Sequence, residues 1–310
     1  MREPVSVVVP TRDRVEMLER CLSALRADLG DSDEIVVADS ASADPAAVML
    51  TAQRWGASVV RCERAGASLA RNNGWREARH ALIAFIDDDV RVHRGWADAM
   101  VAGFADDTLG FVSGRVVVPE DQHGAERPVA ISSRTARERL HRDLSGDLGA
   151  SANLGVRRRA LADVDGFDET LGPGSWAASA EDLDLIDRLF RAGWDGLFEP
   201  AAVAEHDQWR TRPQLLRLDW RYGKGMGVRL ARLARWDRPR ARRLLREAVI
   251  EQGVRPVLDD LRHGYEFGAI TVATRTLATV LGVFVGTVGG AVSSTRRARG
   301  ARSTHRASER

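Results

Sequence analysis

The chain has 310 residues, enough for one large α/β domain with an appendage or for two modest domains. Its net charge of +2 is unevenly placed: residues 1–206 carry a net −11 and residues 207–310 a net +13. An acidic half suits metal binding, and a basic part suits a phosphate-bearing partner or an anionic membrane surface. The spacing of Cys21 and Cys62 argues against a disulfide framework or a zinc site, so we expect a reducing compartment.

The first part of the chain alternates strands with helices. Apolar runs predict strands, and apolar residues at helical spacing predict the helices between them. No secretory signal is expected, because the first strand begins almost directly after Met1. Alternation with short loops implies a mostly parallel sheet with a nucleotide site at the strand ends. The expected strands are residues 5–9, 34–38, 57–61 and 81–86, and the expected helices are residues 17–25, 48–55 and 69–79.

Three consecutive acids, Asp87-Asp88-Asp89, follow directly on the apolar run at residues 81–86. Their mutual repulsion is costly unless a cation offsets it, and Mg²⁺ or Mn²⁺ prefers oxygen ligands. Asp87 and Asp89 point to opposite sides of an extended chain, so both can serve only if the strand turns here. The triplet is therefore either a metal and phosphate site or a solvated acidic turn.

A second region begins after the strand expected at residues 111–118. It contains a helix that opens at Glu181-Asp182, where acids in the first turn favour the helix end. An Arg-rich helical region at residues 212–263 follows, and the chain closes with an apolar segment and a basic tail. These composition changes indicate further segments beyond the catalytic part.

Four blocks of the sequence carry a family resemblance: residues 7–12, residues 36–44, residues 70–74 with 87–89, and residues 166–169 with 181–182. Taken in order, they resemble family 2 glycosyltransferases with the GT-A fold, over roughly residues 5–206. The expected fold class is α/β, with a GT-A type, Rossmann-like, mostly parallel mixed sheet flanked by helices and a C-terminal helical extension. We expect a nucleotide-sugar half at residues 1–115, an acceptor and catalytic half at 116–207, an Arg-rich extension at 208–266, an apolar helix at 267–295 and a disordered basic tail at 296–310.

The resemblance implies transfer of a sugar, with inversion, from a nucleotide-diphosphate donor to an acceptor hydroxyl, assisted by Mn²⁺ or Mg²⁺. The acceptor is a glycan, a lipid-linked sugar or a small molecule, and nucleic acid is not an expected partner. Processive members of the family carry a Gln-x-x-Arg-Trp motif and several membrane spans. Gln208-Trp209-Arg210 lacks that order, so we expect a non-processive enzyme of glycan or glycolipid synthesis.

The resemblance also implies the donor contacts. Residues at the ends of the first strands would border the base and ribose, and Asp39 would accept a hydrogen bond from the base. An ordinary strand-end Asp that caps a turn is the alternative for Asp39, and a solvated Arg is the alternative for Arg71. Asp88 is grouped with the donor contacts as the spare acid of the triplet. The implied donor contacts are Pro10, Thr11, Arg12, Asp39, Arg71, Asn72, Asp87 and Asp88.

The metal and the base complete the site that the resemblance implies. Asp89 would bind the ion that bridges the two phosphates, and His206 would be a further ligand, although a lone His is more often structural. Asp182 would be the base that takes the acceptor proton, with Glu181 as the second choice. In the alternative interpretation, these acids only complement a helix N-terminus.

The C-terminal apolar segment raises the question of membrane attachment. Thr276–Val292 is at the short limit for a spanning helix, and the small residues Gly282, Gly286 and Gly290 would allow close helix packing. A basic tail favours the cytoplasmic side, so a single span would separate the catalytic half from its donor. We therefore expect a cytoplasmic protein with a helix that lies on the cytoplasmic membrane face, or else a docking helix.

Two other classes remain open. A sugar nucleotidyltransferase shares the fold type, but such enzymes usually have a glycine-rich loop after the first strand, and residues 10–14 contain no glycine. A non-catalytic nucleotide-sugar-binding scaffold would not need Asp182.

Overall fold

The computed structural model describes residues 2–122 and 131–307, and side chains as far as Thr287. Contacts within the chain divide it into two compact units. The first, which we call the sheet unit, comprises residues 1–176 and 181–209. The second, the helical unit, comprises residues 177–180 and 210–310. Each unit is described separately.

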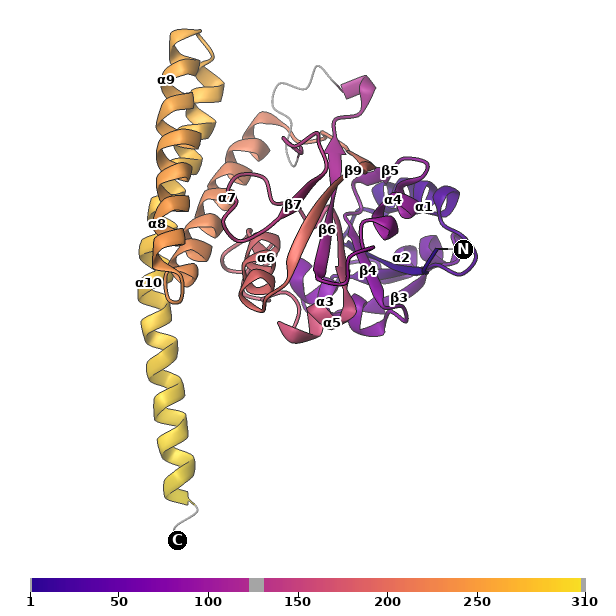
Figure 1. Cartoon of the computed structure of the whole chain (residues 1–310), viewed down its shortest axis with the longest axis horizontal. Coiled ribbons are helices and arrows are strands. Elements are labelled where there is room, and N and C mark those ends of the chain that lie inside the picture. The colour runs from indigo at the N-terminus through magenta and orange to yellow at the C-terminus, as the bar shows by residue number, and fades with distance from the viewer. Residues whose placement is uncertain (1, 123–130, 308–310) are drawn as a thin grey trace. The chain divides into compact units, whose positions relative to one another are not determined.

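A mixed sheet forms the centre of the sheet unit (Figure 1). Within the described residues its strand order is β3-β2-β1-β4-β8-β6-β9-β5, and β7 pairs with β9. The strands from β3 to β4 are parallel, whereas β8 runs antiparallel to both of its neighbours. The strands are β1 (Val5–Thr11), β2 (Glu34–Asp39), β3 (Ser58–Arg61), β4 (Leu82–Ile86), β5 (Val90–Val92), β6 (Leu109–Val117), β7 (Glu138–Leu140), β8 (Asn153–Arg157) and β9 (Asp195–His206).

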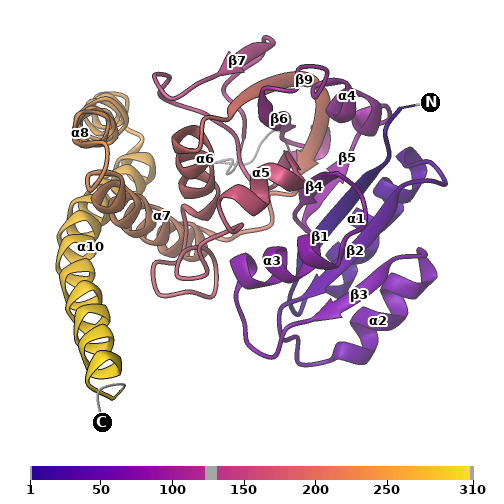
Figure 2. The same ribbon diagram turned by 60° about the horizontal axis from the view of Figure 1, so that its bottom comes forward.

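Helices cover both faces of this sheet, as Figure 2 shows for α2 and α3. Because successive side chains of a strand point to opposite faces, Val7 and Val9 pack with α1, α2 and α4, while Val8 packs with α3, α5 and α6. The structure thus confirms the predicted α/β fold with a mixed sheet. The helices are α1 (Val15–Asp28), α2 (Pro45–Arg54), α3 (Ala67–Glu77), α4 (Trp96–Ala102), α5 (Arg158–Asp163) and α6 (Glu181–Arg191), with a 3₁₀ turn at Glu120–Gln122.

Local chemistry explains how two of these helices are placed. Asp44 accepts a hydrogen bond from the Ala47 N–H at 3.0 Å, and Pro45 begins α2, which is a favourable helix start. Helix α3 approaches β1 closely at Gly74, where an added Cβ would lie 2.4 Å from Val8 Cγ1. Glycine at this position therefore lets the second half of α3 pack directly on β1.

The helical unit consists of consecutive helices, with a π-helical stretch, η2, between α8 and α9. Helix α10 is helical through the arginine-rich residues 296–307, for which the sequence predicted a disordered tail; arginine and alanine have high helix propensity. One segment of it, Glu266–Thr287, is long and apolar enough to cross a membrane. The elements are α7 (Arg212–Leu233), α8 (Arg238–Arg246), η2 (Glu247–Val254), α9 (Arg255–Arg262) and α10 (Glu266–Ala307).

Small residues let α7 and α10 pack closely. A Cβ added at Gly227 would lie 2.2 Å from the Thr279 carbonyl oxygen, and one added at Gly282 would lie 2.4 Å from the Lys224 carbonyl oxygen. Gly286 is similarly close to Ala231, so two of the three glycines expected to allow close packing do so. The third glycine, Gly290, lies outside the residues whose packing the structure describes.

Ala177–Ala180 belongs to the helical unit although the chain on either side of it belongs to the sheet unit. The Ser179 hydroxyl donates to the Arg221 carbonyl oxygen of α7 at 2.9 Å. Ala178 and Ala180 have φ angles of 70° and 66°, which are unusual for alanine. Such a backbone persists only where its surroundings hold it.

Candidate active site

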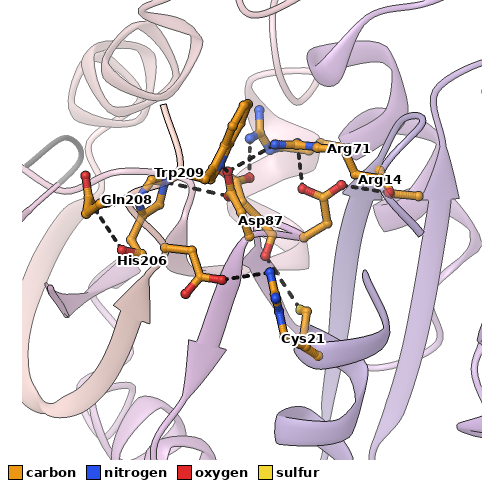
Figure 3. A network of polar contacts seen from close by, with 12 residues as sticks. Arg14, Cys21, Arg71, Asp87, His206, Gln208 and Trp209 are labelled. Carbon is orange, nitrogen blue, oxygen red and sulfur yellow. Dashed lines mark hydrogen bonds and ion pairs between the residues drawn. The ribbon is translucent and has the colours of Figure 1, made fainter. Parts of the chain in front are cut away.

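The three acids after β4 form a tight turn, and Figure 3 shows the first of them, Asp87, among the polar side chains of this region. The Val90 N–H donates to the Asp87 carbonyl oxygen at 3.1 Å, so the chain reverses within the triplet and continues into β5. The required turn is therefore present, and all three side chains can take part in one site. Asp88 and Asp89 are buried, whereas Asp87 is partly exposed.

Arg71 of α3 links this turn to the start of α6. Its Nη2 donates to Asp87 Oδ1 at 2.7 Å and its Nη1 to Glu181 Oε1 at 3.0 Å. Arg71 is only 3 % exposed, so the alternative of a solvated arginine is not what the structure has. Burial raises the pKa of Glu181 to about 7, and Asp182 adds to the effect while Arg71 opposes it. One guanidinium shared by two carboxylates offsets their charge incompletely.

Asp182 is the second residue of α6 and is less buried than Glu181. Its Oδ1 accepts a hydrogen bond from the Leu183 N–H at 2.8 Å, and its Oδ2 lies 3.4 Å from the Ser151 N–H. Burial raises the pKa of Asp182, while these backbone N–H groups and Arg71 oppose the shift. A carboxylate with a raised pKa is a stronger base at neutral pH.

Asp88 is the most deeply buried acid of the triplet. Thr11 of β1 donates its hydroxyl to Asp88 Oδ2 at 2.7 Å. Arg14 Nη2 lies 2.5 Å from Asp88 Oδ1, an atom that is otherwise without a hydrogen-bond donor. Burial raises the pKa of Asp88 to about 7, against the effect of Arg14 and with that of Asp89. Asp88 thus points into the protein and contacts the residues that leave β1.

Asp89 is surrounded by nitrogen donors. Arg14 Nη1 and Trp209 Nε1 donate to Asp89 Oδ2 at 3.0 and 2.9 Å. His206 Nε2 lies 3.6 Å from Asp89 Oδ1, and its other ring nitrogen is 3.0 Å from the Gln208 side-chain nitrogen. The pairing of β5 with β9 brings His206 opposite Val90, next to the triplet (Figure 3).

A divalent metal is implied by the resemblance, and the side chains at Asp89 fit one in their chemistry. Carboxylate oxygen and imidazole nitrogen both bind Mn²⁺, and Asp89 Oδ1 lies 3.6 Å from His206 Nε2, so these two side chains would hold the ion. In the part of the chain that the structure describes, no group of three His, Cys, Asp or Glu side chains is already arranged to hold an ion. The positive charge next to Asp89 is supplied instead by the Arg14 guanidinium, which pairs with both Asp88 and Asp89.

The donor contacts expected at the first strand ends lie on neighbouring strands. Pro10 and Thr11 close β1, and Asp39 closes β2 opposite Thr11 in the register. Asp39 is buried, accepts a hydrogen bond from the Ser42 N–H at 2.9 Å and pairs with Arg61. Arg12 is about half exposed just beyond β1. Contact with the donor remains a prediction for each of these residues.

Asn72 lies beside Arg71 but points toward the backbone of Phe167. Its Nδ2 donates to the Phe167 carbonyl oxygen at 2.8 Å, and its Oδ1 accepts from the Phe167 N–H at 2.8 Å. Trp75 Nε1 also donates to Oδ1, at 3.2 Å. The side chain thus fixes the turn at Gly166, whose φ of 64° suits glycine. The predicted donor contact of Asn72 stays a prediction.

The structure brings Arg71, Asp87 and Glu181 into one polar network, and Asp182 follows Glu181 in α6. Arg14 joins Asp88, which Thr11 bonds, to Asp89 and its neighbour His206. Sequence reasoning missed Arg14 and Trp209. Arg14 lies four residues after Pro10 in the loop that leaves β1, and Trp209 lies three residues after His206. Their closeness to predicted site residues was the available signal. Nothing in the sequence says that both side chains turn toward Asp89.

Comparison with known proteins identifies the family of the chain. The family model for glycosyl transferase family 2 matches residues 6–164. The Pre-mycofactocin glycosyltransferase of Mycobacterium tuberculosis is 32 % identical over 233 residues, which are 70 % of this chain and 44 % of that protein. Glycosyltransferase AglE of Haloferax volcanii is 26 % identical over 229 residues, 71 % of this chain and 72 % of that one. The chain thus spans less than half the length of the mycobacterial relative.

Solved structures show the same fold. The mannosyltransferase PcManGT from Pyrobaculum calidifontis, in complex with GDP-Man and Mn²⁺, has a TM-score of 0.63 at 20 % identity, covering 92 % of this chain and 87 % of that one. Residues 1–349 of S. aureus TarS give a TM-score of 0.52 at 18 % identity, with coverage of 87 % and 90 %. The fold is of the GT-A type. With a family model that matches half of its length, the chain belongs to glycosyl transferase family 2.

Proposed function

We propose that this protein is a non-processive, inverting glycosyltransferase that moves a sugar from a nucleotide-diphosphate donor to an acceptor hydroxyl. The observation that carries the proposal is the Arg71 bridge, which holds Asp87 of the donor side within one network with Glu181 at the start of α6. Inverting transfer needs the base and the donor sugar in a fixed relationship, so that the acceptor oxygen attacks as its proton leaves.

Asp182 is the proposed base. Glu181 is bound by Arg71 and more deeply buried, so it is poorly placed to meet an incoming acceptor. Asp182 has no such ion pair of its own in the network described above, and its raised pKa favours proton uptake. In this assignment Glu181 holds Arg71, Arg71 orients Asp87, and Asp182 takes the proton from the acceptor hydroxyl.

Asp39, Pro10, Thr11 and Arg12 are proposed to bind the nucleoside, because they lie together at the ends of β1 and β2. Asp89 and His206 would hold Mn²⁺ or Mg²⁺. When bound, the metal would stabilise the negative charge that grows on the departing diphosphate. The binding of GDP-Man and Mn²⁺ by PcManGT, which shares the fold, supports this ligand chemistry.

A donor screen tests the proposal. Purified full-length protein is incubated with single nucleotide sugars and Mn²⁺ or Mg²⁺, and release of nucleoside diphosphate is measured with and without EDTA. We expect release with one donor class, lost in EDTA and restored by excess metal. Release that persists in chelator would contradict the metal role. Formation of pyrophosphate from a sugar phosphate and a nucleoside triphosphate would instead indicate a sugar nucleotidyltransferase.

We also propose that the protein works at a cytoplasmic membrane surface. Helix α10 has one face packed on α7, while Leu277, Leu281 and Phe284 are exposed. Arg275, which interrupts the apolar segment, is paired with Asp219 of α7 at 2.5 Å, so its charge is offset within the helical unit. The arginines of residues 296–310 suit anionic lipid.

Fractionation of cells that express the intact chain tests this location. Recovery in the membrane fraction, with release by carbonate, is expected for peripheral attachment. Complete recovery in the soluble fraction would refute it. The variant with Leu277, Leu281 and Phe284 replaced by Ser should shift the protein to the soluble fraction.

A further inference from the structure

The charge of Arg14 is paired with the acids of the triplet and does not stabilise its own helix, α1. It is the N-cap residue of α1 but makes no side-chain capping bond there. A cation at a helix N-terminus is disfavoured by the helix dipole, so the helix does not explain its position. Its guanidinium instead lies 2.5 Å from Asp88 Oδ1 and 3.0 Å from Asp89 Oδ2.

Trp209 keeps the guanidinium in place from the other side. The Arg14 Cζ atom lies 5.8 Å from the centre of the Trp209 ring, within cation–π range, and Trp209 Nε1 donates to the same Asp89 oxygen as Arg14. Arg14 itself is about one-third exposed, so it can leave without opening the core. The arrangement is a removable cation held on two buried acids.

Arg14 and a metal ion at Asp89 would compete for the same negative charge, because both are cations. Two adjacent buried carboxylates need a positive neighbour, and Arg14 supplies it here. A divalent ion on Asp89 and His206 would stand within a few ångströms of the guanidinium and repel it. A guanidinium released in this way has a matching partner in a diphosphate, whose oxygens it binds with two parallel hydrogen bonds.

We propose that Arg14 is an exchangeable counter-ion of the donor site. It neutralises Asp88 and Asp89 in the donor-free protein and transfers to the donor diphosphate when metal and nucleotide arrive together. The inference rests on the proposed function and adds a residue to it. Its consequence is that metal ion alone binds weakly, because it must displace Arg14, whereas metal and nucleoside diphosphate bind cooperatively.

Electron paramagnetic resonance of free Mn²⁺ measures this coupling directly in the full-length protein, without any turnover. Mn²⁺ is titrated alone and in the presence of UDP or GDP, for wild type, Arg14→Gln, Arg14→Lys and Arg26→Gln. Arg26→Gln removes the same charge from the other end of α1, where Arg26 bonds the Trp55 and Gly56 carbonyls. It therefore controls for net charge.

We expect Arg14→Gln to bind Mn²⁺ alone about tenfold more tightly than wild type, because the competing cation is gone. The same variant should lose most of the gain in Mn²⁺ affinity that the nucleoside diphosphate gives to wild type. Arg14→Lys keeps the charge but not the planar guanidinium that spans two acids. Its affinity for Mn²⁺ alone should therefore lie between those of wild type and Arg14→Gln. Arg26→Gln should behave as wild type.

The outcomes separate this inference from the proposed function. If wild type binds Mn²⁺ with nucleoside diphosphate but Arg14→Gln binds Mn²⁺ alone no better than wild type, Arg14 is not a counter-ion of the site. If wild type binds no Mn²⁺ with any nucleotide, the metal role in the proposed function fails and the inference falls with it. Thermal unfolding checks that each variant is folded, and Arg14→Lys carries the test if Arg14→Gln does not fold.

Discussion

The guanidinium of Arg71 donates to Glu181 Oε1 across 3.0 Å, and both side chains are buried. This bond joins α3, near the ends of the parallel strands, to α6, where Asp182 follows directly. A polar pair of this kind is costly to break, because removal of one partner leaves the other charged in a dry environment.

Replacement of Arg71 should therefore destabilise the protein. We expect Arg71→Met to lower the free energy of unfolding by about 3–5 kcal/mol, as measured in urea. The double variant Arg71→Met with Glu181→Met should recover much of that loss, because the buried Glu181 carboxylate is then gone. Asp87 also loses Arg71, but its carboxylate is partly exposed to water. The double variant should not recover sugar transfer. Equal instability of the single and double variants would show that the pair is not what stabilises this region.

Asp182→Asn should lower kcat for nucleoside diphosphate release by about 10²–10⁴-fold and leave donor binding nearly unchanged. Glu181→Gln keeps a hydrogen-bond acceptor for Arg71 and should cost less. Because the pKa of Asp182 is raised, the acid limb of kcat/KM in wild type should lie above the usual pKa of an aspartate. A larger loss of kcat in Glu181→Gln than in Asp182→Asn would show that Glu181, and not Asp182, is the base.

The pH dependence of stability should carry the signature of Glu181. Its pKa is about 7 in the folded protein against an ordinary value of 4.5, so between these pH values the unfolded chain binds fewer protons. The free energy of unfolding should then fall as the pH rises from about 4.5 to about 7. Urea unfolding of metal-free Glu181→Gln should show a shallower fall. Asp88, whose pKa shifts in the same direction, remains as a background in both proteins.

Asn72 is expected to act on folding as well as on the site. Asn72→Ala leaves the Phe167 N–H and carbonyl and the Trp75 N–H without their partner, so we expect a loss of about 2–4 kcal/mol in urea unfolding. Asn73→Ala is the matched control, because the Asn73 amide donates to the Cys62 sulfur, a weak acceptor. Similar losses for both variants would mean that the Phe167 turn does not depend on Asn72.

Much of the fold follows from the sequence because buried parallel strands are continuous apolar runs. Residues 5–9 and 81–86 stand out for this reason, and α6 starts at the predicted Glu181. Strand β8 was not foreseen. It is short, contains Gly155, and owes its place to pairing with β4 and β6. The Asn153 amide bonds backbone of residues far away in the chain, which local patterns do not encode.

The sequence points to the residues of the candidate site, but it does not give their contacts with one another. The acids of the triplet and of α6 can be recognised from the local sequence, because they stand at the end of a strand and at the start of a helix. The contact between Arg14 and Asp89 joins residues 75 positions apart, and it depends on where the turn after β4 directs each side chain. A contact of this kind can be found only from the folded structure.

The excursion of Ala177–Ala180 into the helical unit also bears on how the protein can be divided. A protein shortened to end at Trp209 would lose the α7 carbonyl that Ser179 bonds, and the two left-handed alanines would lose the packing that maintains them. Since Glu181 follows immediately, the loosened backbone would reach the start of α6, where the proposed base Asp182 lies. The sheet unit is thus contiguous in space but not separable by a single cut, and its activity is expected to require the C-terminal helices even if these never touch a substrate.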